Sequence, residues 1–293
     1  MSRAITRGER AFNGINGLIL LVLAIICLAP MLYIVARSFS SEAAITTGKV
    51  YLWPVEFNLN AYSFVLTGNF VTPFLIQTVV TLAGTAISLA LLVMSAYPLS
   101  RKDLAFKKPL MLLVMFTMMF NAGMIPGYIL ISRLGMLNSL WALILPPAFS
   151  GYNMLLVKAY MQSIPDAVVE SAVVEGANHA QILVKLIIPF SVPVLATMVL
   201  FCAVAYWNSY FDAMLYISKA ELKTLQVFLR EIVLFSLNSI NDSYVYDADS
   251  IMARSPEGIR AASIVAATLP ILLVYPFLQR YYITGIMIGS VKG

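Results

Sequence analysis

The chain has 293 residues, of which 60% are hydrophobic and only 11% are charged, and its mean hydropathy is +0.86. Soluble domains carry about 25% charged residues, so this composition excludes an ordinary soluble protein and indicates an integral membrane protein. The net charge of +5 does not imply nucleic acid binding, because basic loops on the cytoplasmic side of a membrane give the same total.

The apolar segments predict an all-α fold. They are long and unbroken, whereas the strands of a membrane barrel alternate over about 10 residues, and a crossing helix needs roughly 20 apolar residues. Six runs meet this description, at residues 15–36, 71–99, 109–132, 140–159, 186–210 and 261–278. The first run follows a basic N-terminus, as in a signal peptide, but it is longer than the 7–15-residue core of such a peptide. We therefore predict a retained helix and six crossings.

The charges between these runs predict the orientation. Six crossings place both termini on one side, and that side collects eleven basic and five acidic residues, a net charge of +6. The other side collects eight basic and nine acidic residues, a net charge of −1. Because basic loops mark the cytoplasmic side, we predict that both termini are cytoplasmic, and with them a polar insert at residues 163–189.

The 163–189 insert has its own helical signals. Ser163, with Asp166 three residues later, predicts a capped helix start. We expect a short helix over residues 167–175, ended by Gly176, and a second helix over residues 177–185.

The first of these helices has an apolar side. Val169, Ala172 and Val173 are predicted to lie together on it, while Glu170 and Glu175 face solvent. From composition alone, an ordinary amphipathic loop helix explains the insert.

The spacing within the insert resembles the EAA loop of ABC importer permeases, E-A-A-x(3)-G-x(9)-I-x-L-P. Glu170, Ala172, Gly176 and Pro189 match this pattern, and the departures are mild: Ser171, Leu186 and Ile188. Three further stretches are similar to sugar permeases, namely residues 53–62, the Trp207-Asn208 pair followed by Phe211, and the ending at residues 285–293. The resemblance runs from about residue 15 to the end and indicates the carbohydrate-uptake group, with an alginate importer as the leading candidate.

The resemblance implies a single transmembrane domain over residues 1–293, with the type I ABC importer permease fold in a bacterial inner membrane. Its parts are an N-terminal segment (1–14), core helices (71–282), a coupling loop (163–189) and an external loop (211–260). The implied partners are a second homologous permease, two ATPases and an extracytoplasmic solute-binding protein. ATP and Mg²⁺ belong to the ATPases, since the chain has no G-x(4)-G-K-[ST] phosphate loop.

The family pattern also assigns the contact with the ATPases. The implied coupling residues are Glu170, Ala172, Glu175, Gly176, Ala177, Asn178, His179, Ile188 and Pro189, and the C-terminal Lys292 and Gly293 are expected to reach the ATPases too. His179 is the only histidine; we interpret it as a solvated loop residue, and nothing in the sequence supports a pH switch.

The substrate pathway has a weaker signature. Aromatic and amide side chains suit sugar rings and hydroxyls, and the candidates are Tyr206, Trp207, Asn208, Tyr210, Asn121 and Asn153. An interfacial aromatic belt explains the aromatic residues as well, and packing kinks explain the Pro- and Gly-interrupted runs.

Two other classes of protein compete with the permease interpretation. An ion- or proton-coupled secondary transporter should show inverted repeats and ionisable residues within the membrane, and a membrane-embedded enzyme should show clustered carboxylates or an H-E-x-x-H motif. Neither signature is evident. Acidic residues at 241–249 lack the glycine and glutamate of a calcium loop, and Cys27 and Cys202 are predicted to be packing residues.

Overall fold

The computed structural model describes residues 7–67, 70–120, 122–238 and 256–290, and all regular structure in these ranges is helical. The predicted pathway residue Asn121, the acidic stretch 241–249 and the C-terminal Lys292–Gly293 lie outside the described residues. The chain separates into two compact units. One contains residues 1–70 and 229–268, and the other contains residues 71–228 and 269–293. The all-α prediction is confirmed.

The first unit is built on one long apolar helix, α1 (Arg7–Ser38). Its stretch Phe12–Ser38 is exposed along its most apolar window, as expected of a helix that faces lipid. Two short helices follow, α2 (Glu42–Thr46) and α3 (Asn60–Thr67). Phe39 stacks between Phe57 and Tyr62, with ring centroids 5.5 and 4.8 Å away, and these contacts fix the polar segment after α1.

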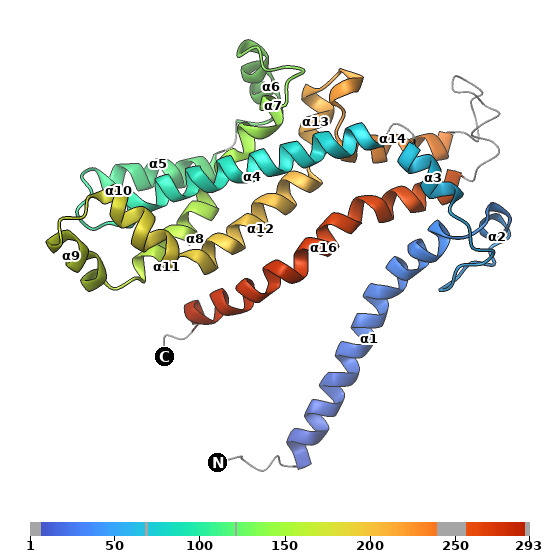
Figure 1. Ribbon diagram of the computed structural model, residues 1–293, viewed down its shortest axis with the longest axis horizontal. Helices are drawn as coiled ribbons and strands as arrows, with labels where there is room; N and C mark the ends of the chain where they lie inside the picture. Colours follow the sequence, from blue (N-terminus) through green and yellow to red (C-terminus); the bar gives the residue numbers. More distant parts are fainter. Residues whose placement is uncertain (1–6, 68–69, 121, 239–255, 291–293) are drawn as a thin grey trace. The chain divides into compact units, whose positions relative to one another are not determined.

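The second unit is organised around α4 (Val71–Ser100), which packs against α8 (Gly151–Gln162) and α12 (Val192–Asn208). The predicted run 71–99 matches α4 within one residue. The helix ends where the apolar sequence gives way to Arg101 and Lys102. Helix α5 (Lys107–Met119) lies against α8, so these four helices form the body of this unit (Figure 1).

Three of the predicted runs are interrupted. The run 109–132 divides into α5 and α6 (Met124–Arg133), and the run 140–159 divides into α7 (Trp141–Ile144), a 3-10 turn (Pro146–Ala148) and α8. The run 186–210 bends by 80° between α11 (Ile188–Phe190) and α12. Pro146 and Pro147 lie at the second break, and Pro189 and Pro193 lie at the third, where proline cannot donate a helical hydrogen bond. At the first break, Gly123 precedes α6 with φ +86°.

The interruptions change the count of crossings. Within the described ranges, three helical stretches are long and apolar enough to cross a membrane: Phe12–Ser38, Val71–Ser100 and Glu257–Val274 of α16 (Pro256–Ser290). Two bent pairs, α5 with α6 and His179–Phe190 with α12, raise the number to five if each pair is one span. Six crossings with cytoplasmic termini therefore stay a prediction.

Several short helices follow α12. They are α13 (Phe211–Tyr216), a 3-10 turn (Ala220–Leu222) and α14 (Leu225–Asn238). In the last of these, Leu225, Leu229 and Ile232 recur at intervals of three or four residues, the spacing of an amphipathic helix.

Candidate functional site

The 163–189 insert forms a compact group of short helices beside the C-terminal end of α4 (Figure 1). It contains α9 (Asp166–Val174), α10 (His179–Ile182), a π-helical turn (Leu183–Ile187) and α11. The first predicted helix, 167–175, agrees with α9 within one residue at each end. The second, 177–185, is wrong in extent, because α10 is a single turn that continues as π-helix.

The predicted cap of the first helix is also wrong. Ser163 ends α8, and its hydroxyl donates a hydrogen bond back to the Tyr160 carbonyl at 2.7 Å. The N-cap position of α9 is Pro165, which makes no side-chain capping bond. Pro165 has an extended backbone, with ψ 132°. A helix capped by Ser163 cannot pass through this residue, so α9 begins at Asp166.

Gly176 closes α9 in a left-handed conformation, with φ +81°. The Gly176 N–H donates to the Val173 carbonyl at 3.0 Å, and the Ala177 N–H donates to the Ala172 carbonyl at 2.9 Å. These two bonds are the Schellman arrangement, in which glycine is favoured because it has no Cβ. The prediction that Gly176 ends the helix is confirmed, and the structure adds the physical reason.

Asn178 fixes the turn into α10. Its side chain accepts a hydrogen bond from the Gln181 N–H at 2.9 Å, and the Gln181 side chain accepts one from the Asn178 N–H at 3.0 Å. This is a reciprocal capping box. The residue that the family pattern placed at the tip of the insert therefore also holds that tip in shape.

The inner side of the insert is buried. Val169 and Ala172 of α9, with Ile182 and Ile187, belong to one apolar cluster with residues of α4, α8 and α12. The outer side exposes Glu170, Glu175 and Val174, and Val174 retains 88% of its surface. Val173 is 51% exposed. It lies on the same side of α9 as Val169, about 40° away around the helix, but it is not buried with Val169 and Ala172. Of the remaining coupling candidates, Ala177 and Ile188 are half-buried while His179 and Pro189 are exposed.

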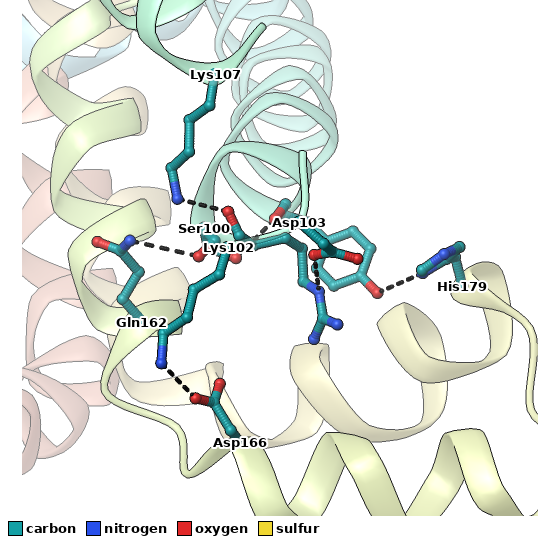
Figure 2. A network of polar contacts seen from close by, with 9 residues as sticks. Ser100, Lys102, Asp103, Lys107, Gln162, Asp166 and His179 are labelled. Carbon is teal, nitrogen blue, oxygen red and sulfur yellow. Dashed lines mark hydrogen bonds and ion pairs between the residues drawn. The ribbon is translucent and has the colours of Figure 1, made fainter. Parts of the chain in front are cut away.

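Polar contacts tie the insert to the segment that follows α4, as Figure 2 shows. The Lys102 Nζ lies 2.7 Å from the Asp166 Oδ2, and the Gln162 side chain donates to the Ser100 carbonyl at 3.3 Å. The Tyr97 hydroxyl lies 3.5 Å from the His179 Nδ1. Hydrogen bonding and charge attraction between the first pair lower the pKa of Asp166 and raise the pKa of Lys102.

Sequence reasoning missed Tyr97, Lys102 and Gln162. The basic residues between positions 101 and 108 predict the orientation of the chain in the membrane but not a contact with the insert. The spacing of Lys102 and Asp166 in the sequence does not indicate that they form an ion pair.

The predicted pathway residues differ in how far their side chains are buried. Tyr206 and Trp207 are buried. The Tyr206 hydroxyl donates to the Ile144 carbonyl at 2.8 Å, and its ring lies where a Cβ on Gly84 would come within 2.5 Å. Asn208 and Tyr210 are exposed and Asn153 is half-buried.

Comparison with known proteins identifies the family of this chain. No model of a protein family matches the chain. The polygalacturonan/rhamnogalacturonan transport system permease protein YtcP of Bacillus subtilis (strain 168) is 41% identical over 275 residues, which are 94% of this chain and 96% of that protein. The chain belongs to the permeases of ABC carbohydrate importers.

Two further relatives agree with this family. Protein LplC of Bacillus subtilis (strain 168) is 38% identical to the permease and covers 98% of it, over 97% of its own length. A crystal structure of a bacterial ABC transporter involved in the import of the acidic polysaccharide alginate matches with a TM-score of 0.87 and 35% identity. That match covers 96% of the permease and 100% of the other chain.

Family membership settles several predictions. The permease is a transport subunit of the bacterial inner membrane, not an enzyme, and ATP hydrolysis belongs to separate ATPase subunits in this family. The type I importer fold is confirmed by the alginate transporter. Membership of the ABC permease family excludes the alternative interpretation as a secondary transporter.

Proposed function

We propose that the permease receives the force of ATP hydrolysis through the outer side of the 163–189 insert. The observation that carries this is the shape of α9 and α10. Their inner side is anchored in the core, their ends are fixed by the Gly176 turn and the Asn178 capping box, and Glu170, Val174 and Glu175 stand exposed. A short, fixed helix with an acidic and apolar outer side suits a groove on another protein.

The proposed assembly has five subunits. The permease pairs with a second homologous permease around one pathway, two ATPases bind ATP and Mg²⁺ below it, and a solute-binding protein delivers substrate from outside. Permeases of this family work with such partners. The Lys292–Gly293 tail is proposed as a second contact with the ATPases.

The proposed substrate is an acidic oligo- or polysaccharide, with alginate as the leading candidate. Two relatives support this choice: YtcP is named for polygalacturonan and rhamnogalacturonan, and the solved transporter imports alginate. These polymers all contain uronate sugars. Asn208 and Tyr210 are the exposed candidates for contact with such a chain, whereas Tyr206 and Trp207 support them from the core.

The coupling role is tested by two substitutions: one reverses a charge on the outer side of the insert, and the other changes the turn that closes α9. The permease, its partner permease and the ATPases are co-expressed, and ATPase co-purification and binding-protein-stimulated ATP hydrolysis are measured for Glu170→Arg and Gly176→Asp. We expect both variants to lose stimulation and to retain less ATPase. Glu221→Arg is the matched control, since Glu221 is an exposed acid outside the insert. If both insert variants transport with full ATP coupling, the proposal is wrong.

The substrate is tested with a panel of glycans. Purified importer in proteoliposomes is assayed for binding-protein-stimulated ATP hydrolysis with oligomers of mannuronate and guluronate, oligogalacturonate and neutral maltooligosaccharides of equal length. We expect stimulation by the uronates alone. Stimulation by the neutral oligomers only would overturn the acidic assignment and leave the coupling role intact.

A further inference from the structure

The contacts that hold the insert converge on a short piece of chain. Tyr97 and Ser100 belong to the last turn of α4, and Lys102 is the second residue after the helix ends. They meet three different parts of the insert region: His179 at the start of α10, Gln162 at the end of α8, and Asp166 at the start of α9. The starts of α9 and α10 are thus both tied to one six-residue stretch, residues 97–102 (Figure 2).

Apolar packing joins the same two segments. Ala96 and Leu99 of α4 are buried in the cluster that contains Val169 and Ile182 of the insert. Leu104, two residues after Lys102, also packs against this cluster. The insert and the end of α4 therefore share polar contacts and one apolar cluster.

The 97–104 stretch is continuous with the long core helix of its unit. Helix α4 runs for 30 residues and packs against both α8 and α12. Packed cores do not deform continuously, so a displacement at one end of a rigid helix is transmitted along it. A push on α9 and α10 consequently reaches α4 through the 97–104 stretch.

We propose that residues 97–104 are the receiving element of the coupling loop, and that Lys102 and Gln162 are positioning residues that join the α9–α10 pair to α4. This inference rests on the proposed coupling role of the insert. Glu170 and Gly176 meet the ATPase, whereas the Lys102–Asp166 ion pair and the Gln162–Ser100 hydrogen bond pass the movement on. Loss of these contacts leaves the shared apolar cluster alone to join α9 and α10 to α4, so less of the movement is passed on.

Charge exchange tests the proposal in the assembled importer. Lys102→Glu, Asp166→Lys and the exchange Lys102→Glu/Asp166→Lys are reconstituted with the partner permease, ATPases and binding protein. The ratio of substrate imported to ATP hydrolysed is measured. We expect each single variant to lower this ratio about two- to five-fold, the range that an exposed ion pair permits, with ATPase co-purification unchanged. The exchange should restore the ratio, and Lys102→Arg should keep it.

A control lies outside both the insert and residues 97–104. Glu221 is an exposed acid in the 3-10 turn Ala220–Leu222. Glu221→Gln should leave the ratio unchanged, while Gln162→Ala should lower it.

The possible results separate this inference from the proposed function. If Glu170→Arg uncouples the importer but Lys102→Glu and Asp166→Lys transport normally, the receiving element is wrong and the docking role stands. If the single variants lose bound ATPase and the exchange does not restore it, the pair contacts the ATPase directly and the inference is overturned. If Glu170→Arg has no effect either, the coupling role itself fails.

Discussion

Replacing Gly176 is expected to weaken coupling through the backbone alone. The residue has φ +81°, and a Cβ built on it meets no atom within 4 Å. A larger side chain therefore costs no steric clash within the chain, and its penalty is that of a left-handed backbone, about 1–2 kcal/mol for residues other than glycine. Asparagine tolerates this conformation better than alanine, and a β-branched residue tolerates it worst.

The predicted order of coupling is glycine, asparagine, alanine, valine. If the Schellman turn must be intact for docking, a cost of about 1 kcal/mol lowers the docked population about five-fold, since 1.4 kcal/mol corresponds to a factor of ten. The assay is ATPase affinity for the detergent-purified permease pair, together with binding-protein-stimulated ATP hydrolysis. Thermal unfolding of the same samples measures the cost to the permease itself.

Gly135 provides a matched control. It follows α6, has φ +67°, meets no atom within 4 Å, and closes its helix with the same two bonds, Gly135 N–H to the Ser132 carbonyl and Met136 N–H to the Ile131 carbonyl. Gly135→Ala should cost similar stability without lowering ATPase affinity. The reasoning is refuted if Gly176→Asn and Gly176→Val bind the ATPase equally well, because the left-handed turn would then be irrelevant to docking.

Gly84→Ala should destabilise the permease by about 1–3 kcal/mol through overpacking against the Tyr206 ring, measured by thermal unfolding in detergent; an unchanged midpoint would show that the ring moves freely. Asn178→Ala should cost about 1 kcal/mol of local stability through the lost cap, seen as faster hydrogen exchange in α10, whereas Asn178→Ser should not. The pKa of Asp166 is lowered from 3.8, so its contribution is present above that value and is lost as pH falls through the lowered pKa; the pKa of Lys102 is raised from 10.5, so its contribution is lost as pH rises through the raised pKa. The import ratio lost in Lys102→Gln should therefore be constant between about pH 5 and about pH 9, and a loss that varies within this range would show that the pair is not responsible.

The sequence by itself determined the class of the protein and the position of its coupling loop. Low charge and long apolar runs leave only membrane helices, because backbone groups in lipid must be bonded within the segment. The ends of α4 followed from hydropathy and Arg101, and α9 followed from a polar stretch closed by Gly176. These are local properties, which neighbouring residues specify without the rest of the fold.

Only the tertiary structure decided which distant side chains meet. Lys102 and Asp166 are 64 residues apart, and Tyr206 fills the space left by Gly84 on another helix. The capping role predicted for Ser163 failed because the extended backbone at Pro165 moved the helix start. The runs 140–159 and 186–210 are divided or bent where prolines lie. Such contacts depend on how helices pack, and hydropathy, which averages over a run, does not record which faces of two helices come together.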